Sequence, residues 1–221
     1  MSGWIDVSRP LSDATAVWPG DTPWSFGLTS SMAAGALANV GAVHGTTHAG
    51  THADAPLHVD PAGDPVDRLP IDAFVGPAWL VDLAGRGAAT GGTGATVAPG
   101  AAIAAEELAA AVPAGAERIL LRTGCDWGGG FPATFRGLSE EASLWCVARG
   151  LRLVGTDAPS VDPFGAESLP AHHALVGGGV VILESLDLAA HPSGRYELVA
   201  LPLRIAGADA SPVRAAIRPM P

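Results

Sequence analysis

The sequence has 221 residues and a formal net charge of -10, with 48% hydrophobic and 15% charged residues. This length and composition predict a single domain, residues 1–221, with a sizeable core, because chains divide into several domains only beyond roughly 250 residues. All twelve basic residues are arginines, which excludes enzymes that need a Schiff-base or P-loop lysine, and the acidic balance excludes nucleic acid as a partner.

The first residues carry no basic region followed by an apolar stretch, and no apolar run reaches 18 residues. We therefore expect a cytoplasmic protein with no membrane partner. Cys125 and Cys146 are too few and too far apart for a disulfide framework or a zinc ribbon, so buried, reduced thiols are expected.

Short runs rich in Val, Ile and Leu predict buried strands at residues 78–82, 118–122, 152–155 and 180–184. A helix is predicted at residues 101–111. Another is predicted at residues 139–149, where Ser139 is placed as the N-cap and Gly150 follows the end. Strand, helix and strand in this order indicate an α/β fold with a mixed, partly parallel sheet flanked by helices.

The stretch 85–100 is dense in Gly, Ala and Thr, and Val97 stands where a dinucleotide-binding fingerprint needs its third glycine. It is interpreted as a flexible surface loop. Residues 196–204 alternate apolar and polar side chains until Pro202, which predicts a strand near a sheet edge.

Four of the seven histidines, His44, His48, His52 and His58, fall within fifteen residues. Glycines, threonines and Pro56 oppose a helix there, and in a strand His48, His52, Asp54 and His58 would share one face. Fully extended, His48 to His58 would span about 33 Å, too far for one ion, so the run must bend. Gly50 and Pro56 are the residues suited to bending it.

A lone histidine is usually a surface or hydrogen-bonded core residue, but this cluster favours a metal site, and imidazole with carboxylate suits zinc, manganese or iron. The role of His44 stays open. Because two histidines and one carboxylate leave metal positions unfilled, further ligands are expected later in the chain. His172, His173 and Glu184 are the candidates, since a glutamate that ends an apolar strand is costly to bury unless it is paired or coordinated.

The pattern His48-x-Gly50-Thr51-His52-x-Asp54-x-Pro56-x-His58 resembles the signature of the cyclase-like metal-hydrolase superfamily. Segments 157–160, 170–173, 182–184 and 196–204 resemble its bacterial kynurenine formamidases, so the resemblance spans most of the chain. Two features depart from that branch: the Gly/Ala-rich stretch at 91–105 is longer, and Ala158 replaces a more usual threonine after Asp157.

The resemblance implies a barrel-like, swivelling β/α fold, a homodimer and two zinc ions, with manganese as an alternative metal. The implied roles are an acid/base for His58 and substrate contact for Trp18, with Trp24 and Phe26 as weaker candidates for the same pocket. His172 is preferred to His173 because its spacing to Glu184 agrees with the family. The implied metal ligands are His48, His52, Asp54, His172 and Glu184, with Asp54 and Glu184 as bridges.

The implied reaction is hydrolysis of N-formyl-L-kynurenine to L-kynurenine and formate by a metal-activated water at a binuclear site. Two alternatives remain open. One is an isatin hydrolase or another cyclase-like amidohydrolase, and the other is a non-catalytic metal-binding protein with a closed site. Serine hydrolysis is disfavoured because no Gly-x-Ser-x-Gly elbow exists and Ser160 is only a loop serine.

Overall fold

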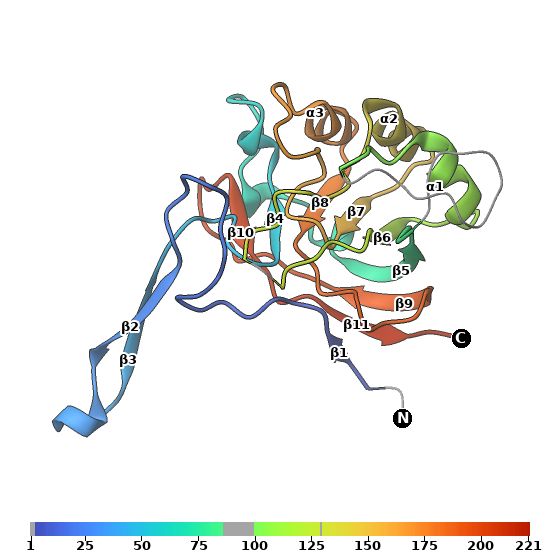
Figure 1. The fold of residues 1–221 in the computed structure, drawn as a ribbon. Coiled ribbons are helices and arrows are strands. Elements are labelled where there is room, and N and C mark those ends of the chain that lie inside the picture. The colour runs from blue at the N-terminus through green and yellow to red at the C-terminus, as the bar shows by residue number, and fades with distance from the viewer. Residues whose placement is uncertain (1–2, 86–99, 129) are drawn as a thin grey trace.

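The computed structural model describes residues 3–85, 100–128 and 130–221 (Figure 1). In these residues, one large sheet contains β1 (Ile5–Asp6), β4 (His52–Asp54), β5 (Val75–Asp82), β6 (Arg118–Arg122), β7 (Leu153–Thr156), β8 (Val181–Glu184), β9 (Gly194–Val199), β10 (Ala210–Pro212) and β11 (Ala216–Pro219). A separate two-stranded sheet consists of β2 (Ser25–Ser30) and β3 (Val40–His44).

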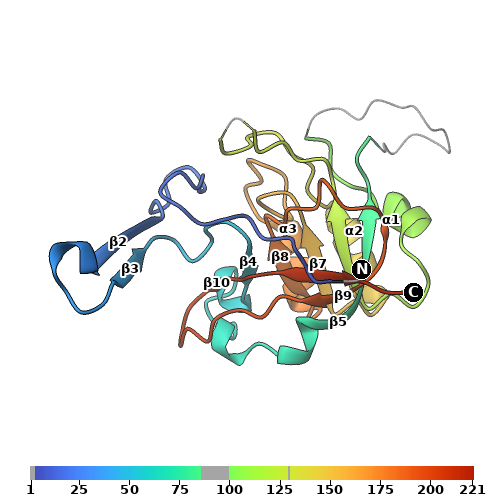
Figure 2. The ribbon, with the colours of Figure 1, turned by 90° about the horizontal axis from the view of Figure 1, so that it is seen from below.

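The large sheet has the order β1-β11-β9-β5-β6-β7-β8-β4-β10. The four central strands β5, β6, β7 and β8 are parallel to one another, and every other pair in this sheet is antiparallel. The mixed, partly parallel sheet expected from the sequence is therefore confirmed. The sheet curls into an open half-barrel, which Figures 1 and 2 show from two directions.

Three α-helices of the described residues, α1 (Ala105–Ala111), α2 (Glu140–Ala148) and α3 (Pro170–Gly177), lie together on one side of the sheet (Figure 1). The short 3-10 helices are η1 (Met32–Ala34), η2 (Pro56–His58), η3 (Val66–Arg68) and η4 (Ile71–Ala73). None of the helices in the described residues is long and apolar enough to cross a membrane.

The helix predicted at 139–149 is confirmed as α2. The side chain of Ser139 accepts a hydrogen bond from the Ala142 amide, and Gly150 follows with a φ of 71°, as a C-terminal glycine does. The helix predicted at 101–111 begins later, at Ala105. The Ala104 amide donates to the Glu107 carboxylate, which fixes the start of α1, and Ala104 itself has an extended backbone.

The alternation of side chains across the parallel strands builds two apolar cores. Ile119, Leu121, Val154 and Ile182 pack against the helices, whereas Leu120, Leu153 and Leu183 pack inside the curl of the sheet. Because successive residues of a strand point to opposite faces, a strand buried on both sides is apolar throughout. This is the pattern that made these strands predictable.

Other expectations need correction. The strand predicted at 196–204 is β9, which begins at Gly194 and ends earlier than predicted, at Val199; it is the third strand from one edge of the sheet, with β11 and β1 beyond it. Cys146 is buried as predicted, but Cys125 is only partly buried. The strand predicted at 78–82 begins earlier, at Val75. Most of the loop predicted at 85–100 lies outside the described residues.

The β2–β3 hairpin projects away from the rest of the molecule, on the side opposite the two termini (Figures 1 and 2). Phe26 pairs with Val43 and Leu28 pairs with Gly41, so one face of the hairpin is apolar. A Cβ on Gly41 would lie 2.3 Å from the Phe26 ring, which shows that the ring lies across this glycine. Phe26, Leu28 and Val43 on this face are nevertheless 56%, 50% and 62% exposed.

Candidate active site

The core of the candidate site is the pairing of β4 with β8. His52 lies opposite Glu184 and Asp54 lies opposite Ile182, so the three polar side chains share the face of the sheet that α3 covers. All three are buried. The intervening Ala53 packs into the other core. Because alternate residues of a strand point to the same face, His52 and Asp54 of β4 lie beside Glu184 of β8 on one face of the sheet.

Helix α3 brings His172 over these strands, and Asp162 holds the start of that helix. Asp162 accepts hydrogen bonds from the amides of Ala171 and His172, at 2.8 and 3.0 Å, and its Oδ2 lies 2.6 Å from His172 Nδ1. The other ring nitrogen of His172, Nε2, faces Asp54 at 3.4 Å and Glu184 at 3.3 Å. Asp162 thus fixes both the helix start and the imidazole that points into the site.

The chain bends twice around this centre, as the sequence predicted. Gly50 has a φ of 59°, and a Cβ there would lie 2.8 Å from the Leu11 side chain, so both backbone and space favour glycine. The bend returns His48 to Asp54, with 3.0 Å between Nδ1 and Oδ1. Pro56 begins η2, which carries His58. Within residues 48–58, only the three residues 52–54 therefore lie in a strand.

Imidazole and carboxylate atoms of the described residues converge in three groups, and within each group one ligand-type atom per residue lies within 4.8 Å of the others. Two groups overlap at Asp54, one of His48, His52 and Asp54 and the other of Asp54, His172 and Glu184. The third, of His48, His58 and Asp209, has no fully buried member. Asp54 belongs to both overlapping groups. Glu184 also faces both, because its Oε2 is 3.3 Å from His52 Nε2 and its Oε1 is 3.3 Å from His172 Nε2.

Several polar atoms at this centre are buried without a hydrogen-bond partner: His52 Nε2, Asp54 Oδ1 and Asp54 Oδ2. Leaving such groups unpaired is costly in a protein interior. Because the partnerless atoms are nitrogen and oxygen atoms that face one another, the residues fit a bound cation.

The electrostatics agree with this interpretation. Burial by itself would raise the pKa of Asp54, but His52, His172 and His48 hold it well below its ordinary value. Burial would lower the pKa of His48, yet the neighbouring carboxylates of Asp209 and Asp54 raise it to about 10. The pKa of His172 is raised in the same way by Asp162, Asp54 and Glu184. The site therefore attracts positive charge, which protons or a metal ion can supply.

His58 lies beside these groups without being enclosed by them. Its ring centre is 4.3 Å from that of His48 and 5.5 Å from that of His172, and its side chain is 29% exposed. Burial lowers the pKa of His58 below its ordinary value, against the opposing attraction of Asp54. A neutral imidazole that faces solvent at neutral pH is suited to accept and donate protons.

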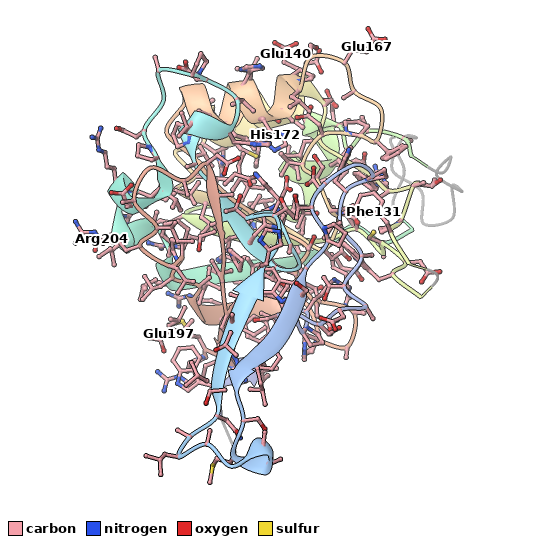
Figure 3. All side chains as sticks on the ribbon, turned by 90° about the vertical axis from the view of Figure 1, so that its left-hand side faces the viewer. Phe131, Glu140, Glu167, His172, Glu197 and Arg204 are labelled. Atoms are coloured by element: carbon pink, nitrogen blue, oxygen red, sulfur yellow. The ribbon has the colours of Figure 1, made fainter. Side chains whose placement is uncertain are left out.

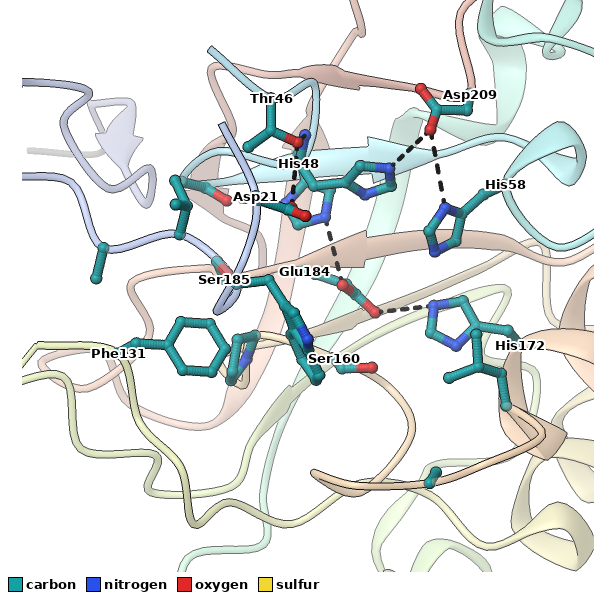
Figure 4. Close-up of a pocket in the computed structure, with 18 of the residues that line it drawn as sticks. Asp21, Thr46, His48, His58, Phe131, Ser160, His172, Glu184, Ser185 and Asp209 are labelled. Carbon is teal, nitrogen blue, oxygen red and sulfur yellow. Dashed lines mark hydrogen bonds and ion pairs between the residues drawn. The ribbon is translucent and has the colours of Figure 1, made fainter. Parts of the chain in front are cut away.

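A cavity of about 510 Å³ opens onto the site (Figure 4). Trp18 lines one wall, and its ring centre lies 5.2 Å from Phe131 and 5.3 Å from Phe164. The other described lining residues are Ala16, Val17, Asp21, Thr46, His48, Gly50, His52, His58, Trp127, Phe131, Pro159, Ser160, Ala166, Glu167, Leu169, His172, Glu184, Ser185 and Asp209. This described lining contains no arginine, although an arginine is a chemically reasonable partner for a substrate carboxylate.

The structure thus brings six of the seven predicted site residues to the cavity wall, and the seventh, Asp54, lies directly behind it. Other candidates lie elsewhere. His44 is exposed on β3, His173 is exposed on α3, and neither Phe26 nor Trp24 lines the cavity. In Figure 3, His172 lies inside the molecule, whereas Glu140, Glu167 and Arg204 lie at its periphery.

Sequence reasoning missed two carboxylates, Asp162 and Asp209. Asp162 contacts His172 from ten positions earlier in the chain, and Asp209 contacts His48 from 161 positions later. Asp162 carried a weak signal, because it precedes the start of α3 and follows the segment 157–160 that resembles the formamidases. Asp209 carried none, since only the pairing of β10 with β4 brings it near the histidines.

Fold and site together define a metal-dependent hydrolase class, and comparisons with known proteins agree. The Cyclase family, described as "Putative cyclase", matches residues 5–163, and the chain belongs to this family. A "predicted metal-dependent hydrolase" from Bacillus stearothermophilus has a similar structure, with a TM-score of 0.80 and 26% identity over 100% of both chains.

Two further relatives indicate the branch. The kynurenine formamidase of Salinibacter ruber is 43% identical to this chain over 98% of each protein. Isatin hydrolase A of Labrenzia aggregata has a TM-score of 0.78 and 25% identity, over 99% of this chain and 94% of its own. The chain is therefore a hydrolytic amidase of the Cyclase family, and its sequence is more similar to the formamidase than to the isatin hydrolase.

Proposed function

We propose that the protein hydrolyses N-formyl-L-kynurenine to L-kynurenine and formate, as the step of tryptophan degradation that releases formate. The observation that carries the proposal is the convergence of His48, His52, Asp54, His172 and Glu184 at the foot of a cavity with an aromatic wall. The 43% identity to a kynurenine formamidase over nearly the whole chain supports the choice of substrate.

We further propose two metal ions, one at each of the overlapping groups, with Asp54 and Glu184 between them. The partnerless atoms of His52 and Asp54 support this arrangement, because an ion would satisfy them. Zinc is the metal expected from the resemblance, and manganese suits the same donors. When bound, the ions would lower the pKa of a water from about 15.7 toward 7 and so supply a nucleophile at neutral pH.

His58 is the proposed acid/base. It lines the cavity beside the ligand histidines, and its lowered pKa keeps the ring neutral and able to accept a proton from the attacking water. The same ring then donates a proton to the aniline nitrogen as the carbon–nitrogen bond of the formamide breaks. Formate and the free amine of kynurenine leave. A positioned acid/base of this kind accelerates a reaction by about 10²–10⁴-fold.

Trp18 is the proposed contact for the aryl ring of the substrate. Its edge contact with Phe131 and its tilted contact with Phe164 hold the indole at the cavity wall. Aromatic faces offer a substrate ring apolar contact with a defined geometry. The site would therefore favour aryl formamides over small aliphatic ones.

Two rival functions lead to different results in one experiment. Formate release from N-formyl-L-kynurenine is measured in the purified protein, after complete chelation and after return of zinc or manganese, with isatin hydrolysis measured in parallel. The proposal predicts formate release that chelation abolishes and metal restores. Faster isatin hydrolysis would reassign the substrate. Activity that survives complete metal removal would refute the metal mechanism, and no hydrolysis of either compound would favour a metal-binding protein without activity.

The open cavity beside the ligand groups argues against this last rival, because structural zinc sites are closed by four protein ligands.

We also propose that the protein is a homodimer and that the exposed apolar face of the β2–β3 hairpin packs in the dimer. An isolated two-stranded hairpin is only marginally stable in water, which supports a partner for this face. The cytoplasmic location stays a prediction.

A further inference from the structure

Asp209 lies between the proposed acid/base and one of the proposed metal ligands, and it belongs neither to the family signature nor to the five proposed ligands, although its carboxylate groups with His48 and His58. Its Oδ2 is 3.2 Å from His48 Nε2 and 4.0 Å from His58 Nδ1 (Figure 4). One carboxylate oxygen therefore faces both imidazole rings. The two rings are themselves 4.3 Å apart between centres, tilted by 45°.

The position of Asp209 is fixed at two points. Its carbonyl oxygen accepts a hydrogen bond of 2.8 Å from the Ala55 amide, at the end of the β4–β10 pairing. Its Oδ1 accepts a hydrogen bond of 2.9 Å from Thr47 Oγ1. Although the Asp209 side chain is 44% exposed, it is held at both its backbone and its carboxylate, unlike an ordinary surface aspartate.

The three proposed ligand histidines share one arrangement, and Asp209 completes it. His52 Nδ1 lies 2.9 Å from the Gly50 carbonyl, and His172 Nδ1 lies 2.6 Å from Asp162. In His48 the nitrogen facing Asp54 is Nδ1, and the opposite nitrogen, Nε2, faces Asp209. Each histidine thus directs one nitrogen to the metal groups and the other to an acceptor, which is how proteins orient metal-binding imidazoles.

We propose that Asp209 is a positioning residue that orients His48 toward the metal groups and fixes the ring of His58 beside them. Accepting the Nε2 hydrogen of His48 leaves Nδ1 as the free nitrogen that faces Asp54. The same oxygen lies 4.0 Å from His58 Nδ1, too far for a hydrogen bond but near enough for its charge to attract the ring and favour its place at the cavity wall. The inference deepens the proposed function and rests on it for the role of His58.

Metal affinity provides the first test, because it needs no substrate. Zinc affinity of the purified chain is measured by competition with a chromophoric chelator in Asp209→Leu, Asp209→Asn and the control Asp64→Asn, which removes an exposed carboxylate that pairs with Arg68. Asp209→Leu should weaken binding about 10–100-fold, as loss of a ligand's orienting partner does. Asp209→Asn should weaken it less, because its amide oxygen still accepts the Nε2 hydrogen.

The second test separates His58 from His48. At saturating zinc, Asp209→Leu should lower kcat for N-formyl-L-kynurenine while KM stays near its original value. Adding Asp209→Leu to His58→Ala should produce no further loss of kcat, since residues that act through one another are not additive. Thr47→Val removes the hydrogen bond to Asp209 Oδ1 but keeps the carboxylate. It should also lower kcat while KM stays near its original value, by a smaller factor than Asp209→Leu.

Unchanged zinc affinity in both Asp209 variants would overturn the role toward His48. Additive losses of kcat in the double variant would overturn the role toward His58. If the unsubstituted protein does not hydrolyse N-formyl-L-kynurenine, the proposed function fails, but the zinc titration still decides whether Asp209 orients His48. If circular dichroism shows that Asp209→Leu does not fold, zinc affinity and kcat are compared among Asp209→Asn, Thr47→Val and the control Asp64→Asn. Losses in the first two that exceed those of the control would support the role of Asp209, and losses equal to the control would overturn it.

Discussion

The β2–β3 hairpin and the histidine run 48–58 follow one another in the chain but lie in opposite environments. The hairpin exposes Phe26, Leu28 and Val43 on one face, although these residues are apolar. A few residues later, His52 and Asp54 are almost completely buried, although they are polar. Side-chain polarity alone would have predicted the reverse in both regions.

The difference between the two regions lies in their partners. β4 pairs with β8 on one side and β10 on the other, and α3 covers its polar face, so its histidine and aspartate meet groups from distant parts of the chain. The hairpin pairs only with itself in the described residues. The burial of a segment therefore depends on which other segments pack against it. Substitutions in the run 48–58 and at its partners should affect metal binding and catalysis, whereas a substitution in the hairpin should affect self-association.

The largest expected effect comes from removing the carboxylate shared by both metal groups. Asp54→Asn should bind fewer than two zinc ions per chain and lose roughly 10³-fold or more in kcat/KM, since metal ions contribute several kcal/mol to transition-state stabilisation. His172→Ala should lose mainly one ion. Metal content is measured by elemental analysis alongside activity. A variant of Asp54 that keeps two tightly bound ions would show that this residue does not join the two groups.

The next effect separates two histidines that the sequence places in one cluster. His58→Ala should lower kcat about 10²–10⁴-fold with near-normal metal content, because a general acid/base is lost and no ligand is. His44→Ala is the matched control. It lies exposed on β3 and should leave both kcat and metal content unchanged. Loss of metal in His58→Ala would instead make that residue a ligand.

A smaller effect is expected behind the site, at Asp162. Asp162→Ala should weaken zinc binding about 10–100-fold by freeing the ring of His172. It should also lower the free energy of unfolding by about 1–3 kcal/mol, because two buried amides at the start of α3 lose their acceptor. Thermal unfolding and zinc titration measure the two effects. Glu140→Gln, an exposed substitution at the start of α2, is the control, and equal losses in the two variants would contradict the role of Asp162.

The smallest effect on catalysis is expected in the hairpin. Phe26→Ser should shift the protein from dimer to monomer in light scattering, because it removes an apolar side chain from the face proposed to pack in the dimer. Activity per subunit should change little, since Phe26 does not line the cavity. Ala42→Ser, on the opposite face of the hairpin, should leave assembly unchanged. Dimers that persist equally in both variants would place the dimer contact elsewhere.

Much of the sheet could be predicted because its central strands are buried on both faces. Leu120 and Leu121 point into different cores, so β6 is apolar at every position, and the same holds for Val154 in β7 and its neighbours. The short strands at the sheet ends gave no such signal. β9 was predicted near a sheet edge from its alternating pattern, but the two strands beyond it, only two and four residues long, were not predicted.

The sequence by itself determined the local features of the site: a histidine run that had to bend at Gly50 and Pro56, and a strand ending in a glutamate. These features depend on backbone preferences and on the spacing of neighbouring residues, which the sequence shows directly. Only the tertiary structure decided that Asp162 and Asp209 stand behind His172 and His48, and that the hairpin remains uncovered. Those contacts join segments far apart in the chain, and they depend on the order and register of strands that no local pattern specifies.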